Sequence, residues 1–211
     1  MKRFTQIATS LLVVLLFTPV LFAEETLRAV SKVINGDTII LEGGERVHLI
    51  GVACPDVDNR ERNFRMATSL KIDSYNFHRY GAEARTMVRD MIEGSFVHLD
   101  LDEAHKGRRH KDGLGRTLAY VYHTNQIFKK RSKDKYLRGV VYRLDDNYWH
   151  ININALLLKK GFCAVDVTYP FRTKRRFQYL AKWAKHFKRG IWVEPEKMIW
   201  DWGEGHVSSG N

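Results

Sequence analysis

Asn35-Gly36-Asp37-Thr38, followed along the chain by Val47-His48-Leu49-Ile50-Gly51-Val52 and by Cys54-Pro55-Asp56, is the stretch that decides the fold and the chemistry of this sequence. It places one carboxylate at a turn and a second one just after a strand, and Gly115-Arg116 adds an arginine from a third segment. A divalent cation prefers oxygen ligands, a hydrolytic water needs a base, and a phosphate that gains charge needs a fixed guanidinium. The pattern therefore indicates a site for a phosphodiester.

On either side of this stretch the sequence shows the periods of short strands and amphipathic helices. We expect three strands in a meander from Arg28 to Val52, with turns at Asn35-Gly36 and Gly43-Gly44. Further strands are expected at 96–102, 118–122, 140–144 and 148–153, and helices at 81–93, 154–160 and 177–187. The polar segment 59–77 lacks an apolar period and predicts a mobile loop. Together these elements predict a small α+β protein.

The chain is strongly basic, with a net charge of +11 over 211 residues and an isoelectric point near 9.7. This length is sufficient for one well-buried domain. A positive excess favours polyanionic partners, although a solvated basic surface that aids solubility is the alternative. The same two interpretations stay open for the cluster within 122–140, whose members are Lys129, Lys130, Arg131, Lys133, Lys135 and Arg138.

The amino terminus has the pattern of a secretory signal. Lys2 and Arg3 precede an apolar segment that extends to Ala23, and two acidic residues follow it. We therefore expect a signal peptide over 1–23, a folded domain over 24–195 and a tail over 196–211. Leu21 is larger than the residue preferred three positions before a cleavage site, so an uncleaved anchor is the alternative. Both versions predict an exported protein, either periplasmic or secreted.

The sequence contains two cysteines, Cys54 and Cys163. Neither has a second cysteine at zinc-finger spacing, and no His-Glu-x-x-His string occurs, so we expect no zinc site.

Several motifs, in a fixed order, resemble those of the staphylococcal nuclease (thermonuclease) family, and the resemblance extends from Val30 to Trp192. Each motif alone is weak, but their order and spacing together are specific. The motifs are Val33-Ile34-Asn35-Gly36-Asp37-Thr38-Ile39, Leu49-Ile50-Gly51-Val52-Ala53-Cys54-Pro55-Asp56, Tyr80-Gly81-Ala82-Glu83-Ala84, Asp112-Gly113-Leu114-Gly115-Arg116-Thr117-Leu118-Ala119-Tyr120 and Arg189-Gly190-Ile191-Trp192.

The resemblance implies a fold and a cross-link. The family's architecture is an OB-fold five-stranded β-barrel with three helices, and such barrels commonly bind oligonucleotides on an open face. In that fold the segments that carry Cys54 and Cys163 run beside each other, which implies a disulfide in an exported protein. Two buried free thiols are the alternative.

The resemblance also assigns roles to individual residues. Arg116 falls on the arginine that binds phosphate, and Asp56 takes the place of the glutamate associated with the attacking water. Asp37 and the backbone carbonyl of Cys54 fall on ligands of a divalent cation, which is calcium in the family, with magnesium or manganese as further candidates. His48 takes the place of a second phosphate-binding arginine.

Three of these positions depart from the family's pattern. Ala53 stands where the family has a metal-binding aspartate, so a carboxylate is missing unless Asp56 or Asp58 helps to bind the cation. Asp56 is one methylene shorter than glutamate. His48 is shorter than arginine, titrates near neutrality and cannot offer two parallel donors. Arg116 and Asp37 are retained without change.

These observations predict an exported metal-dependent nuclease that hydrolyses DNA and/or RNA with little sequence preference. We expect it to be a monomer with no stable membrane association after the signal is cleaved. The alternative is a nuclease-fold module with weakened catalysis that binds nucleic acid or another polyanion, as Ala53 and His48 favour. An envelope protein whose fold serves protein contacts is a third possibility, and it would show no salt-dependent binding of polyanions.

Overall fold

The computed structural model of this protein describes residues 27–108, 110–124, 139–143 and 149–193. The expected signal peptide, the basic cluster at 129–138 and the tail at 196–211 lie outside the described residues. The strands are β1 (Leu27–Asn35), β2 (Thr38–Leu41), β3 (Arg46–Leu49), β4 (Val52–Ala53), β5 (Phe96–Leu101), β6 (Thr117–Thr124), β7 (Val141–Arg143), β8 (Trp149–Asn152) and β9 (Ala164–Val165). The helices are α1 (Arg60–Leu70), α2 (Phe77–Ile92), α3 (Ile153–Lys160) and α4 (Lys174–His186), with short 3-10 turns at Glu103–Arg108 and Gly190–Trp192.

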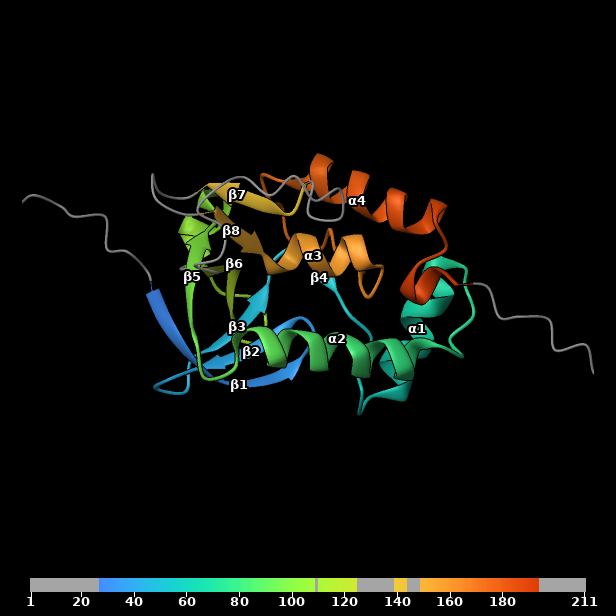
Figure 1. The fold of residues 1–211 in the computed structure, drawn as a ribbon, viewed down its shortest axis with the longest axis horizontal. Coiled ribbons are helices and arrows are strands. Elements are labelled where there is room, and N and C mark those ends of the chain that lie inside the picture. The colour runs from blue at the N-terminus through green and yellow to red at the C-terminus, as the bar shows by residue number, and fades with distance from the viewer. Residues whose placement is uncertain (1–26, 109, 125–138, 144–148, 194–211) are drawn as a thin grey trace, which may run out of the picture.

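Five strands form a closed barrel in the order β3-β2-β1-β5-β6. All neighbours in this order pair antiparallel, and the barrel closes because β3 also pairs parallel to β6, with Val47 opposite Thr117. In Figure 1, α3 lies between α2 and α4, and most of the strands lie to the left of these three helices. Helix α2 contacts β1, and α3 contacts both α4 and β6. The predicted α+β class, five-stranded barrel and three-strand meander are confirmed.

Helix α2 begins at Phe77, four residues earlier than expected, because Phe77 is itself fully buried. Its inward side chains, Ala84, Val88 and Ile92, pack into the barrel core. Gly81 lies inside the helix and serves a close approach, since a Cβ there would lie 2.7 Å from the backbone oxygen of Pro55. The glycine thus lets α2 pack against the chain segment that leads to Asp56.

The expected mobile loop at 59–77 is wrong, because most of this segment forms helix α1. The Asn59 side chain caps the helix by accepting a hydrogen bond from the Arg62 backbone N–H at 2.8 Å, and Lys71 ends it in a left-handed conformation. The helix buries only Asn63 and Ala67, so it lacks the apolar stripe by which helices are normally predicted. In Figure 1, α1 lies at the end of the molecule next to the start of α2.

Helix α3 follows the hairpin β7–β8 along the chain and packs against the barrel strand β6. The buried Asn152 caps it by accepting from Ala155 N–H at 2.7 Å, and Gly161 ends it with a φ of 76°. The fully buried Asn154 side chain accepts from Val121 N–H and donates to the carbonyls of Ile50 and Ala119. One amide group therefore joins α3 to two segments of the barrel.

Cys54 and Cys163 form a disulfide, which settles the choice between a cross-link and two free thiols. Both residues are fully buried. Beside them, β4 and β9 pair antiparallel, with Ala53 opposite Ala164. The disulfide therefore ties the segment before Asp56 to the segment that follows α3.

Candidate active site

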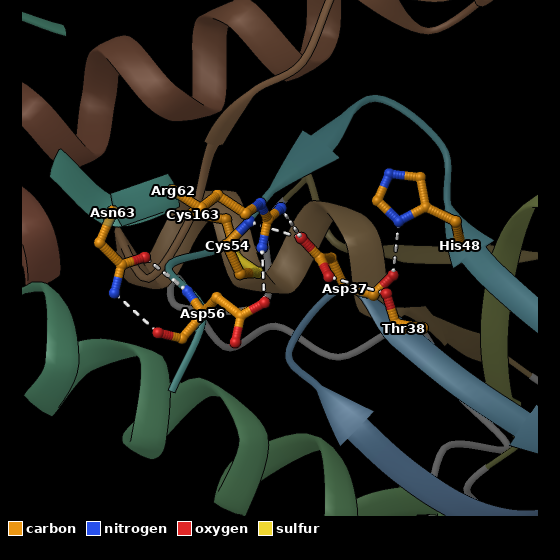
Figure 2. The surroundings of a disulfide bond; sticks show 8 residues. All are labelled: Asp37, Thr38, His48, Cys54, Asp56, Arg62, Asn63 and Cys163. Atoms are coloured by element: carbon orange, nitrogen blue, oxygen red, sulfur yellow. Dashed lines mark hydrogen bonds and ion pairs between the residues drawn. A yellow bond between two sulfur atoms is a disulfide. The ribbon is translucent and has the colours of Figure 1, made fainter. Parts of the chain in front are cut away.

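Asp37 lies in the turn between β1 and β2, and it is almost completely buried, with a side chain 1% exposed. Its Oδ2 accepts the backbone N–H of Cys54 at 2.8 Å, and its Oδ1 accepts the Thr38 hydroxyl at 3.0 Å (Figure 2). Gly36 permits this packing, because a Cβ there would lie 2.9 Å from the Cys54 sulfur. The turn thus carries a fixed carboxylate beside the disulfide.

Asp56 is held from three sides. Its backbone N–H donates to the Asn63 Oδ1 and its carbonyl accepts from the Asn63 Nδ2, both at 2.7 Å. Its Oδ2 accepts from the Asn35 side chain at 3.2 Å, and its Oδ1 accepts the backbone N–H of Asp58 at 3.0 Å. The Asp56 side chain keeps 19% exposure, so its position is fixed while solvent still reaches it.

Arg62 joins the two carboxylates. Its Nη2 lies 3.2 Å from Asp37 Oδ2 and its Nη1 lies 3.4 Å from Asp56 Oδ2 (Figure 2). Sequence reasoning missed Arg62 and Asn63 because both fall in the segment predicted as a loop. The signal that could have found them is Asn59, a favoured cap residue that places both side chains in the first turn of a helix just after Asp56.

Arg116 lies in the loop just before β6, and its side chain reaches the turn between β1 and β2. Its Nε donates to Asp112 Oδ2 at 2.7 Å, and its Nη1 donates to the Thr38 hydroxyl at 3.3 Å. Burial by itself raises the pKa of Asp112, but hydrogen bonds from Arg116 and Leu114 outweigh it, so the net pKa of Asp112 is lowered. An ionised Asp112 therefore orients the guanidinium, which keeps 20% exposure.

His48 lies on β3, and it is 4% exposed. Its Nδ1 is 3.0 Å from the backbone carbonyl oxygen of Asp37. Burial lowers the pKa of His48; Arg116 lowers it further, while Asp37 acts in the opposite direction. A neutral imidazole is therefore favoured at neutral pH, and its observed contact is with the Asp37 backbone.

The candidate oxygen ligands for a cation are the carboxylates of Asp37 and Asp56 and the backbone carbonyl of Cys54. Within the described ranges, no group of three or more His, Cys, Asp or Glu side chains is arranged to hold a metal ion. The Arg62 guanidinium is nevertheless a cation in contact with both carboxylates, which shows that Asp37 and Asp56 face a shared cation position. Carboxylate and carbonyl oxygens are the ligand type that a hard divalent cation prefers, so such an ion could bind here only with the guanidinium displaced.

The structure thus brings the expected site residues together at one end of the barrel. Asp37 contacts Cys54, His48 and Thr38, Arg62 links Asp37 to Asp56, and Thr38 links Asp37 to Arg116. Asp58 contacts Asp56 through its backbone N–H.

Residues 46–194 match the family model described as staphylococcal nuclease homologue. Asp56 and Arg116 lie within the matched part, whereas Asp37 precedes it. A thermonuclease of Staphylococcus intermedius is 32% identical over 123 residues, which cover 56% of this chain and 62% of that protein. A thermonuclease of Staphylococcus hyicus is 29% identical over 134 residues, which cover 60% of this chain and 66% of that protein. The chain therefore spans just under two thirds of the length of each of these relatives.

Proposed function

Because this chain belongs to the staphylococcal nuclease family, we propose that it is a metal-dependent nuclease that hydrolyses phosphodiester bonds. The observation that carries the proposal is the continuous set of contacts that joins Asp37, Asp56 and Arg116 at one end of the barrel. A base, a cation site and a guanidinium are the groups that phosphodiester hydrolysis requires.

In the proposed reaction, a water oxygen attacks phosphorus, the bond from phosphorus to the leaving oxygen breaks, and the leaving oxygen takes a proton from solvent. Asp56 accepts the proton of the water, for which its partly exposed carboxylate is suited. Arg116 donates hydrogen bonds to phosphate oxygens and stabilises the charge that develops on them. Asp112 keeps the Arg116 guanidinium in place during this step.

A divalent cation, proposed to be calcium with magnesium or manganese as alternatives, would be held by Asp37 and the Cys54 carbonyl. When bound, it supplies Lewis-acid polarisation of the phosphate and of water. We assign His48 to the site as a positioning residue, because its ring contacts the Asp37 backbone.

The proposed substrates are DNA and/or RNA, cleaved with little sequence preference by a monomer. A basic chain attracts such polyanions by releasing their counterions. We further propose export, to the periplasm or the medium, on the basis of residues 1–23, without stable membrane association after cleavage of the signal. In the part of the chain that the structure covers, no helix has the length and apolarity needed to cross a bilayer.

The test is cleavage of single-stranded DNA, double-stranded DNA and RNA by the purified chain with calcium, magnesium, manganese or a chelator. Arg116→Ala and Asp37→Ala are compared with wild type, and circular dichroism checks that each variant is folded. Metal-dependent cleavage that both substitutions abolish supports the proposal. A folded Arg116→Ala variant with wild-type cleavage would refute it.

A second candidate function is a module that binds nucleic acid or another polyanion with weakened catalysis. Ala53 and the neutral, buried His48 favour it, because one lacks a carboxylate and the other lacks a charged donor. Such a module binds nucleic acid in the presence of a chelator, with an affinity that falls as salt rises, and shows no cleavage with any metal.

A further inference from the structure

We propose that the Arg62 guanidinium competes with a divalent cation for the Asp37 carboxylate, with which it forms an ion pair while it also contacts Asp56. A metal ion can then reach the Asp37 carboxylate only when the guanidinium leaves it. This inference rests on the metal site of the proposed function, and it adds a residue that the sequence motifs do not contain.

The burial of Asp37 supplies the first argument. A carboxylate that is 1% exposed is costly to keep ionised unless it is paired with a cation or with several donors. Asp37 Oδ2 has a backbone N–H at 2.8 Å and the Arg62 guanidinium at 3.2 Å. Of the contacts described for Asp37, the one with Arg62 brings a full positive charge.

The geometry of α1 supplies the second argument. The Asn59 cap binds the backbone N–H of Arg62 itself, and the next residue, Asn63, forms the reciprocal pair of bonds with the Asp56 backbone. The first turn of α1 is therefore formed by the Asn59 cap and attached to Asp56 through Asn63, the residue next to Arg62. Arg65, one turn along the same helix, instead pairs with Glu61 and is 64% exposed.

The Arg62 guanidinium and a divalent ion compete because both would bind the carboxylate of Asp37. A divalent ion at Asp37 Oδ2 would lie beside the Nη2 of Arg62, and like charges at such a separation repel strongly in a partly buried site. The Arg62 side chain is 33% exposed, so it has a solvent side toward which it can withdraw. Part of the metal's binding free energy is then used to displace the guanidinium.

The test is calcium binding, measured by isothermal titration calorimetry at pH 7.5 on the purified chain without nucleic acid. The variants are Arg62→Gln, which removes the charge, and Arg65→Gln, a matched control on the same helix. We expect Arg62→Gln to bind calcium about tenfold more tightly than wild type or to bind it where wild type does not. We expect Arg65→Gln to equal wild type, and Asp37→Asn in the Arg62→Gln background to abolish the gain.

Arg62→Lys is a second variant, which tests the inference if Arg62→Gln does not fold. Arg62→Lys keeps a positive charge but lacks the planar fork that contacts both carboxylates, so we expect its calcium affinity to lie between those of wild type and Arg62→Gln. Equal calcium affinity in wild type, Arg62→Lys and Arg62→Gln, or no binding by any of them, would overturn the inference. If Arg62→Gln gains affinity while no form of the chain cleaves nucleic acid, this inference stands and the proposed nuclease activity fails.

Discussion

Asn63 offers a direct link between the fold and the proposed chemistry, because its side chain holds both backbone groups of Asp56. Asn63 is 5% exposed, and its two hydrogen bonds to Asp56 are each 2.7 Å long. Substitution Asn63→Ala removes both bonds. At about 1 kcal/mol for each bond, the free energy of unfolding falls by about 2 kcal/mol, which lowers the folding equilibrium constant about 30-fold.

The same substitution is expected to reduce cleavage while the Asp56 side chain remains present. Misplacing a base by about 1 Å costs on the order of 100-fold in rate, so we expect kcat to fall about 10- to 100-fold. Urea denaturation measures the stability change, and cleavage of a short DNA duplex well below the unfolding transition measures kcat.

Ser69→Ala, in the exposed last turn of α1, is the control and should leave both quantities unchanged. A folded Asn63→Ala variant with the expected loss of stability and wild-type kcat would refute the link between Asn63 and catalysis. Wild-type stability would refute the contribution of the two hydrogen bonds.

Three further predictions concern the disulfide, the core and pH. Replacing Cys54 and Cys163 together by alanine opens a cross-link that spans 109 residues. Chain entropy predicts a loss of about 4–5 kcal/mol in urea unfolding, and a much smaller loss when both proteins are compared in reductant. Asn154→Ala leaves three buried backbone groups without their observed partner, and thermal unfolding should show a loss of about 3 kcal/mol or more. Burial lowers the pKa of His48 and of His123 in the folded chain. As pH falls below about 6.5, the unfolded chain therefore binds protons before the folded chain does, and the free energy of unfolding drops. His48→Gln should flatten the decline of the urea midpoint between pH 7 and 5, and an unchanged slope would contradict this.

The barrel and the positions of two candidate site residues were predictable because their signals are local. The Asn35-Gly36 turn fixes where β1 ends, and the alternation around Val97 and Leu99 gives β5 one buried face. Asp37 and Arg116 sit within motifs whose residue order survives in this chain. Helix α4 begins at Lys174, three residues before the expected start, because polar residues in its first turn carry no periodic signal.

Helix α1 was not predictable in the same way. Its stability comes from a cap, from Asn63 and from a small apolar group around Ala67, Phe77, Ala164 and Ile191, whose members are distant in sequence. A polar helix that packs one amide against a neighbouring backbone has no hydrophobic period to detect. The contact of Arg62 with Asp37 depends on that helix, so it was hidden for the same reason.

Ala53 and Arg62 change the charge of the site in the same direction. An aspartate at position 53 would add a negative charge next to Cys54, whose N–H already binds Asp37. Its absence, together with a guanidinium between the remaining two carboxylates, makes the site less negative and so less attractive to a metal ion. Both differences also reduce the repulsion that a phosphate group meets there. The calcium affinities of the Arg62 variants therefore measure how strongly the two cations compete for Asp37, and the cleavage assay decides between the two candidate functions.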